Sequence, residues 1–191
     1  MSFMTRQQLE KMGFLTMGEN VLISRKASIY GASIIRIGNN VRIDDFCILS
    51  AGEGGICLGN YIHIACYTSL IGKEKITLSD FSNLSSRVSI YSSNDDYSGN
   101  HMTNPMVPSE LTNVDHRPVR IGRHCIVGSG TIILPGVVME EGSAVGSLSL
   151  VTKNCNAFGI YAGVPARFIK KRSKGMLERE KKFTAKPAPN R

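Results

Sequence analysis

Aliphatic side chains occupy every sixth position through most of this chain. The series comprises Ile23 and Ile29; Ile37, Ile43 and Leu49; Leu58, Ile64 and Leu70; Leu78, Leu84 and Ile90; and Ile121, Val127, Ile133, Met139, Val145 and Val151. An α-helix repeats every 3.6 residues and a flat strand every two, so neither would select each sixth residue. A chain that winds through three short flat faces per turn does select it. The repeat therefore predicts an all-β solenoid with a triangular cross-section.

A second series supports this interpretation. Small or β-branched residues follow many of the first positions by four, namely Val41, Cys47, Thr68, Val88, Thr131, Val137, Ser143 and Ser149. They form a second inward-facing set. The alternative, a β-sandwich, would place turns about every 8–12 residues and would alternate more strictly. The spacing favours the solenoid.

The repeat is interrupted once, between Ile90 and Ile121. A long loop in a compact repeat protein is often functional, so the loop 91–119 is the first place to look for a site. Smaller slips at Gly31–Ala32, 52–55 and 72–75 are predicted to be bulges at corners. Residues 1–20 are expected to hold a cap helix that begins after Thr5 and ends near Gly13. The solenoid then spans 21–170, and 171–191 form a basic C-terminal helix and tail.

The formal charge of +8 is confined to one end of the chain. Residues 167–191 contain ten Lys and Arg against two Glu, whereas the remainder is neutral. Nucleic-acid binding usually needs a basic folded surface, so we expect no nucleic-acid partner. The five cysteines are far apart and are predicted to be reduced core residues. No apolar run is long enough to span a membrane, and a cytoplasmic location is expected.

The segment "VRIGRHCIVGSGTIILPGVVMEEGSAVGSLSLVTKNCNAFGIYAGVPARFIKK" resembles the hexapeptide-repeat, left-handed β-helix acyltransferases. Its ending is the most specific part. Together with "SIYSSNDDYSGNHMTNPMVP", the sequence is most similar to bacterial N-acetyltransferases that act on dTDP-linked amino-dideoxy sugars for lipopolysaccharide O-antigen. The resemblance implies a left-handed parallel β-helix, a homotrimer with sites between chains, and acetyl-CoA as co-substrate.

The resemblance also implies where coenzyme A binds. Gly128, Gly146 and Ala162–Gly163 would keep a groove shallow for the pantetheine arm. The alternative is that the serines and glycines only form corner turns and that the lysines belong to a solvated tail. The implied cofactor-binding residues are Ser129, Gly146, Ser147, Thr152 and Lys153 along the arm, with Lys170, Lys171 and Arg172 near the phosphates.

The O-acetyltransferases of this family place a catalytic histidine at the start of the protruding loop. Asp95 stands there in this chain, between Asn94 and Asp96. A hydroxyl acceptor needs a general base, whereas an amine attacks a thioester with weaker help, so the change favours N-acetylation. Asp95 and Asp96 are therefore the catalytic candidates. The alternative is that they only form the turn that begins the loop.

Several residues are candidates for contact with the acceptor. His63 and His101 are possible substrate contacts, while His116 is expected to pack at the loop's return and His124 to be exposed at a corner. Aromatic and cationic side chains can line a site for a nucleotide sugar, although tyrosine packs equally well within loops. The remaining substrate-binding candidates are Tyr67, Arg87, Tyr91, Asn94 and Tyr97.

Three other functions remain open. A sugar O-acetyltransferase of the galactoside or maltose type is disfavoured by the missing histidine. A zinc enzyme of the γ-carbonic anhydrase kind would need three converging histidines, and the four here lack the spacing, so no metal is expected. A non-catalytic binding scaffold would not need the long loop.

Overall fold

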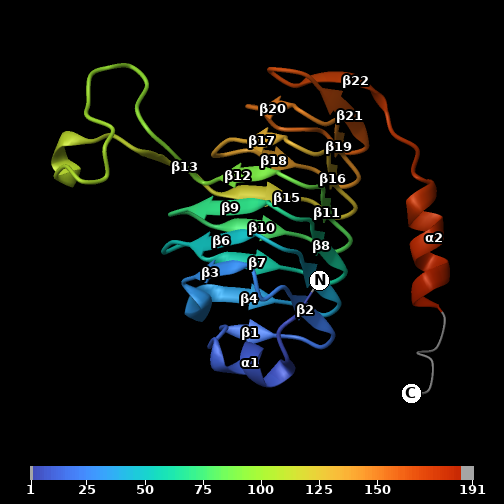
Figure 1. Cartoon of the computed structure of the whole chain (residues 1–191). Coiled ribbons are helices and arrows are strands. Elements are labelled where there is room, and N and C mark those ends of the chain that lie inside the picture. Colours follow the sequence, from blue (N-terminus) through green and yellow to red (C-terminus); the bar gives the residue numbers. More distant parts are fainter. Residues whose placement is uncertain (1, 186–191) are drawn as a thin grey trace.

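The computed structural model describes residues 2–185 and is built from three parallel sheets that wind around one core (Figure 1). The chain visits the sheets in turn, so each full turn of the solenoid adds one strand to each sheet. Sheet 1 contains β1 (Thr16–Met17), β4 (Ile35–Ile37), β7 (Ile56–Leu58), β10 (Ile76–Leu78), β15 (Val119–Ile121) and β18 (Val138–Met139). The predicted fold class, a left-handed parallel β-helix, is confirmed.

The other two sheets follow the same order along the solenoid. Sheet 2 contains β2 (Val21–Ile23), β5 (Val41–Ile43), β8 (Ile62–Ile64), β11 (Asn83–Leu84), β16 (Ile126–Val127), β19 (Ala144–Val145), β21 (Gly159–Ala162) and the antiparallel β22 (Arg167–Lys171). Sheet 3 contains β3 (Ser28–Tyr30), β6 (Ile48–Ala51), β9 (Ser69–Gly72), β12 (Ser89–Tyr91), β17 (Ile132–Ile133) and β20 (Leu150–Val151).

The core consists of the two inward series that the sequence predicts. Ile23, Ile43, Ile64 and Leu84 occupy equivalent places in successive turns and are fully buried. Burying an aliphatic side chain of this size contributes about 1.5–3 kcal/mol, so the stacked series stabilises the whole solenoid. All other members of both series are buried except Ile29 of β3, which is half-buried against the core near the N-terminal end.

The corners between the sheets adopt a left-handed backbone conformation without requiring glycine. We call the corner between sheets 1 and 2 the first corner, that between sheets 2 and 3 the second, and that between sheets 3 and 1 the third. Positive φ angles occur at Asn20, Asn40, Tyr61, Phe81, His124 and Phe158 along the first corner, and at Phe46, Tyr67, Arg87 and Leu148 along the second. Hydrogen bonds between turns, such as Tyr61 N to Asn39 O at 2.9 Å, hold these corners.

The N-terminal helix α1 (Arg6–Lys11) covers the first turn of the solenoid. The Thr5 side chain accepts a hydrogen bond from Gln8 N and caps the helix, as predicted, and Gly13 has a φ of 72°. Leu9 is 1% exposed and joins the core. Because β1 already pairs with β4, the first sheet begins at Thr16 rather than after residue 20.

The C-terminal segment is expected to form a basic helix and tail from residue 171, and its helix begins slightly later. The strand β22 extends to Lys171, and α2 (Gly175–Thr184) starts four residues later. Figure 1 shows α2 running back alongside the turns that precede it. The end of the predicted tail, residues 186–191, lies outside the described part of the chain.

Two general expectations can be compared with the described residues. All five cysteines are free. Cys47, Cys125 and Cys155 are buried in the core, as predicted, whereas Cys57 and Cys66 are half-buried, so the expectation of a core position is wrong for these two. Burial raises the pKa of the Cys47 thiol to about 11 and that of Cys155 to about 12. Within residues 2–185, none of the helices has the length and apolarity required to cross a lipid bilayer.

Candidate functional site

The long loop leaves the solenoid at the third corner through a two-stranded antiparallel ribbon. Strands β13 (Ser93–Asn94) and β14 (Asp115–His116) pair with each other, and a short 3-10 helix, η2 (Ser109–Leu111), lies further out. The Ser93 hydroxyl lies 2.8 Å from Nδ1 of His116, so this histidine closes the ribbon, as expected. Figure 1 shows the loop projecting away from the solenoid. The ribbon fixes the position of the residues that directly follow it.

Asp95 is the first residue after the ribbon and is exposed. Its carboxylate has no hydrogen bond or ion pair with any residue between 2 and 185. It lies beside a hollow of about 340 Å³ that is lined by Tyr91, Ser93, Asn94, Asp95, Tyr97 and Val114. An unpaired carboxylate beside aromatic and amide groups is available to orient a ligand and to accept a proton.

Asp96 has a different role. Its carboxylate accepts hydrogen bonds from the Ser98 N–H at 2.8 Å and the Ser98 hydroxyl at 2.9 Å, and Nδ1 of His101 lies 2.6 Å away. The Ser98 backbone and side chain and then His101 lower the pKa of Asp96 to about 2. Asp96 and His101 therefore hold the turn of the loop, which agrees with the turn interpretation for this aspartate.

The second corner carries an exposed aromatic column. The rings of Phe46 and Tyr67 stack with centroids 5.0 Å apart, and the Arg87 guanidinium lies 5.7 Å from the Tyr67 centroid. Tyr67 is 52% exposed. Two predicted substrate contacts, Tyr67 and Arg87, are thus neighbours on successive turns of the solenoid.

The same corner holds the middle of the predicted coenzyme groove. Ser129 follows β16 and Ser147 follows β19, one turn further on. A side chain at Gly128 would overlap the backbone of Gly146 and Ser147, so the two turns approach closely here only because residue 128 is glycine. Thr152 and Lys153 are exposed but follow β20 and lie toward the third corner.

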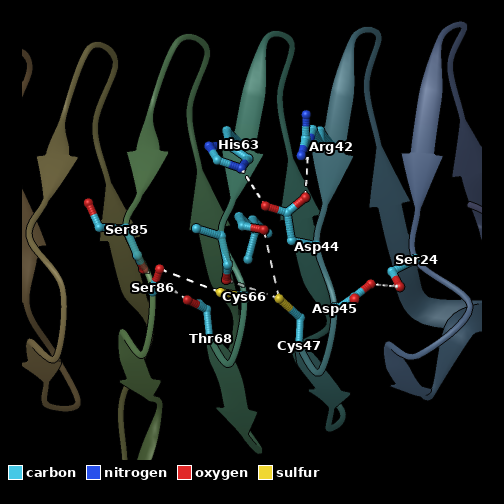
Figure 2. A network of polar contacts seen from close by, with 12 residues as sticks. Ser24, Arg42, Asp44, Asp45, Cys47, His63, Cys66, Thr68, Ser85 and Ser86 are labelled. Atoms are coloured by element: carbon cyan, nitrogen blue, oxygen red, sulfur yellow. Dashed lines mark hydrogen bonds and ion pairs between the residues drawn. The ribbon is translucent and has the colours of Figure 1, made fainter. Parts of the chain in front are cut away.

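His63 occupies the outward face of sheet 2, and Figure 2 shows its ring directed at the Asp44 carboxylate. Its Nε2 lies 2.9 Å from Asp44 Oδ2, and its Nδ1 lies 3.1 Å from Asn83 Oδ1. Because both ring nitrogens are engaged, neither is free to take a proton from a substrate. His63 is therefore unsuited to act as the missing general base.

The last turn of the solenoid contains a second hollow, of about 560 Å³. Phe158, Tyr161 and Phe168 line it together with Lys171, Arg172 and Lys174. Aromatic walls and cations suit a nucleotide phosphate group. Arg172, however, donates through Nη1 to the carbonyls of His124 at 2.8 Å and Gly142 at 3.0 Å, so it also holds the backbone. Lys170 of β22 is exposed.

The expectation that His124 is exposed is wrong. Only 10% of its side chain is exposed because α2 covers it: Nε2 lies 2.8 Å from Glu180 Oε2, and the ring stacks on Phe81. Burial, followed by the charge of Arg123, lowers the pKa of His124 despite the opposing charge of Glu141. The same glutamate, Glu180, also pairs with Arg123.

Within the described part of the chain, no group of three or more His, Cys, Asp or Glu side chains is arranged to hold a metal ion. The four histidines lie at four separate places: sheet 2, the loop, the loop's ribbon and the first corner.

Comparison with known proteins gives the family. No protein-family model matches the sequence. The chain is 58% identical to a dTDP-4-amino-4,6-dideoxy-D-glucose acyltransferase of Escherichia coli over 96% of this chain and 95% of that protein. The chain belongs to the left-handed β-helix acyltransferases.

Solved structures of a second relative extend the comparison. The N-acyltransferase AntD of Bacillus cereus superimposes on this acyltransferase with a TM-score of 0.93 and 47% identity, covering 96% of this chain and 97% of AntD. That structure contains dTDP-4-amino-4,6-dideoxyglucose and coenzyme A, and another contains dTDP and 3-hydroxybutyryl-CoA. A galactoside O-acetyltransferase of E. coli is more distant, at 27% identity over 86% of this chain and 68% of that protein.

In this acyltransferase, the predicted catalytic and substrate-binding residues, together with Ser129 and Ser147, fall into two groups at opposite edges of sheet 3. One group comprises the loop residues after Tyr91, at the third corner. The other comprises Tyr67, Arg87, Ser129 and Ser147 at the second corner, with His63 on the adjoining face of sheet 2. Within one chain the two groups therefore lie at different corners of the solenoid.

Sequence reasoning did not single out Asp44, Asn83 or Ser85. Asp44 and Asn83 are the partners of His63 and lie 19 and 20 residues from it, close to one turn of the solenoid. Residues one turn apart lie side by side, so a spacing of about one turn was the sequence feature that could have identified these partners of His63. The Ser85 hydroxyl has no hydrogen-bond partner within residues 2–185.

Proposed function

We propose that this chain transfers an acyl group from a coenzyme A thioester to the amino group of dTDP-4-amino-4,6-dideoxyglucose. Acetyl-CoA is the donor that the sequence favours. One observation carries the assignment to this site: the unpaired Asp95 carboxylate at the start of the loop. Several AntD structures carry a replaced serine or a replaced aspartate ten residues further along that chain, and Ser85 and Asp95 have the same separation here.

The reaction requires the amine to attack the thioester carbonyl in its unprotonated form. The amine nitrogen forms the new C–N bond and the carbonyl opens to an oxyanion. The carbonyl then re-forms as the C–S bond breaks and the coenzyme A thiolate leaves, and the amine loses one proton. We assign Asp95 to orient the amine and to receive that proton directly or through a water molecule. The free Ser85 hydroxyl is placed to donate a hydrogen bond to the oxyanion that develops on the carbonyl.

We further propose that the enzyme is a homotrimer in which Asp95 of one chain meets Ser85 and His63 of the next. The separation of the two groups within one chain supports this arrangement. So does the apolar character of the second corner and sheet 3, where Leu148 is 75% exposed and Phe46, Ile48 and Ile132 are also exposed. Cyclic closure would cover these side chains.

In this arrangement the acyl donor follows the second corner past Ser147 and Ser129 toward Ser85. Gly128 and Gly146 allow the pantetheine arm to approach the backbone, and Lys171 and Lys174 at the last turn suit its phosphates. We place the reaction in the cytoplasm and in the synthesis of surface polysaccharide. A putative lipopolysaccharide biosynthesis O-acetyl transferase of E. coli, 27% identical, supports the latter.

O-acetylation of a sugar is the second candidate and is disfavoured by the histidines. An alcohol needs a general base, and the two candidates, His63 and His101, are held by Asp44 and Asp96.

The test is an assay of coenzyme A release with a matched panel of acceptors. The panel should contain dTDP-4-amino-4,6-dideoxyglucose, the 3-amino isomer, the 4-hydroxy sugar and galactosides, each with acetyl-CoA and with 3-hydroxybutyryl-CoA. We expect turnover with the 4-amino sugar and none with the 4-hydroxy sugar. Turnover with hydroxyl acceptors alone would reject the proposal.

A further inference from the structure

Three polar side chains form a row across the outward face of sheet 2. Arg42 of β5, His63 of β8 and Asn83 of β11 are direct partners in the strand register, one turn apart. Adjacent strands lie about 4.8 Å apart, so outward side chains in register contact one another. Figure 2 shows Arg42 and His63 converging on the Asp44 carboxylate.

Asp44 anchors this row. The residue is 5% exposed, Arg42 Nε donates to its Oδ1 at 2.7 Å, and His63 Nε2 lies 2.9 Å from its Oδ2. Burial favours the neutral acid, but the hydrogen bonds and charges of Arg42 and His63 outweigh it and lower the pKa of Asp44. An ionised carboxylate only accepts hydrogen bonds, so His63 must carry a hydrogen on Nε2.

The other side of the ring then determines the orientation of an amide. Oδ1 of Asn83 faces the imidazole ring, 3.1 Å from Nδ1 of His63. This orientation turns the Asn83 NH₂ group away from the ring. Among the described residues, Nδ2 of Asn83 has no hydrogen-bond partner.

The free amide group lies where the proposed acceptor would bind. Asn83 precedes Ser85 by two residues along the strand. An amide N–H donates to oxygen, and a hydrogen bond to an ionised oxygen is stronger than one to a neutral oxygen, so an anionic group of the acceptor is the preferred partner.

We propose that Asp44 and His63 are positioning residues that turn the Asn83 amide nitrogen outward, where it donates a hydrogen bond to the diphosphate of the nucleotide sugar. Asn83 makes the contact, and the other two act through it. This inference rests on the proposed function because it assigns the nucleotide sugar to this face of sheet 2. The inference adds that this face of sheet 2 contacts the diphosphate group of the nucleotide sugar.

The test compares steady-state kinetics of Asn83→Ala, Asp44→Asn and the double variant with wild type. Removing one hydrogen bond to a charged group should raise KM for the dTDP-sugar about tenfold in Asn83→Ala. We expect little change in kcat or in KM for the acyl-CoA. Asn83→Asp should be weaker still, because a carboxylate would face the phosphates. The matched control is Thr77→Ser, on the outward face of sheet 1, which should behave as wild type.

The double variant separates positioning from simple packing. If Asp44 acts through Asn83, Asp44→Asn should raise KM in the wild-type background and have little further effect in the Asn83→Ala background. Additive effects, or an unchanged KM in Asn83→Ala, would overturn the inference. His63→Gln provides a second route if Asp44→Asn does not fold, and it should show the same loss of additivity.

One further measurement does not depend on turnover. Calorimetry with dTDP alone should show about tenfold weaker binding to Asn83→Ala than to wild type. If wild type binds dTDP in this manner but acylates no amino sugar, the proposed function fails while this inference survives. Equal dTDP binding by both proteins would overturn the inference alone.

Discussion

Phe183, near the end of α2, meets Tyr61 of the first corner edge to face, with ring centroids 5.2 Å apart and planes inclined by 82°. The same ring lies edge-on to Phe81, and Tyr61 and Phe81 stack on each other at 4.8 Å. The C-terminal helix is therefore seated on side chains from turns far from it in sequence. The sequence predicts a basic helix in this segment, and the structure adds that the helix packs against the first corner of the solenoid.

Replacing Phe183 with alanine should loosen α2 without unfolding the solenoid. Each edge-to-face pair contributes about 0.5–1.5 kcal/mol beyond its buried area. We expect the backbone amides of α2 to exchange with solvent about tenfold faster while the sheet amides are unchanged. Hydrogen exchange read by mass spectrometry measures this. Glu178→Ala, an exposed position in the same helix, is the control; equal exchange in the two variants would show that the ring does not seat the helix.

Asp95→Asn should lower kcat by about 100-fold with an unchanged melting temperature, because the amide cannot accept the proton and the carboxylate supports no local contact. Ser85→Ala should lower kcat in the same way through the loss of one donor. Steady-state assays and thermal melts measure both. A wild-type kcat for Asp95→Asn would leave this aspartate with no catalytic role.

Mixing the two variants tests whether the site is shared between chains. Trimers assembled from Asp95→Asn and Ser85→Ala chains contain one interface with both groups intact, so co-expressed protein should recover about a third of wild-type activity per mixed trimer. If both residues served the same chain's site, every site would lack one group and activity would stay at the level of the single variants.

The pH dependence of the loop should follow Asp96. Its folded pKa of about 2 lies below the ordinary value of 3.8, so ionisation favours the ordered turn. The contribution is complete above the ordinary value and is lost as the pH falls toward 2. The amide resonance of Ser98, followed by NMR on acidification, should titrate below 3.8. A midpoint at 3.8, or the same curve in Asp96→Asn, would contradict the hydrogen-bonded turn.

Gly128→Ala should destabilise the enzyme by about 1–3 kcal/mol, because the new methyl group would overlap the backbone of the next turn at Gly146 and Ser147. Denaturant unfolding measures the loss. Gly175→Ala at the start of α2 is the matched control: its added carbon meets nothing nearer than 3.5 Å, and helix propensity predicts a gain of up to ~1 kcal/mol. Equal stability of the two variants would mean that the turns can separate at no cost.

The core was predictable from sequence because each turn repeats the same burial. The period of six identifies Ile43, Ile64 and Leu84 as core residues. The helix that Thr5 caps is recognisable from the residues next to it in sequence. Pairings across turns were less accessible. Asp44 and Asn83 meet His63 only because the intervening turns have particular lengths, and the corner slips hide that register.

The two adjacent aspartates show a second limit of prediction from the sequence. Asp95 and Asp96 carry the same charge and differ by one position, yet only Asp96 reaches Ser98 and His101. The prediction that His124 is exposed was wrong for a related reason. Its cover, Glu180 of α2, lies 56 residues away in a segment whose composition resembles a solvated tail.

The seating of α2 has a consequence for chain length. Helix α2 has ten residues, a span of about 15 Å, and its contacts run from the turn of His124 back to that of Tyr61. Most solenoids tolerate the gain or loss of a whole repeat. Here, deleting one turn between Phe81 and the last strand would shift α2 by one turn along the solenoid and separate Glu180 from His124. The contacts of α2 therefore require a fixed number of turns.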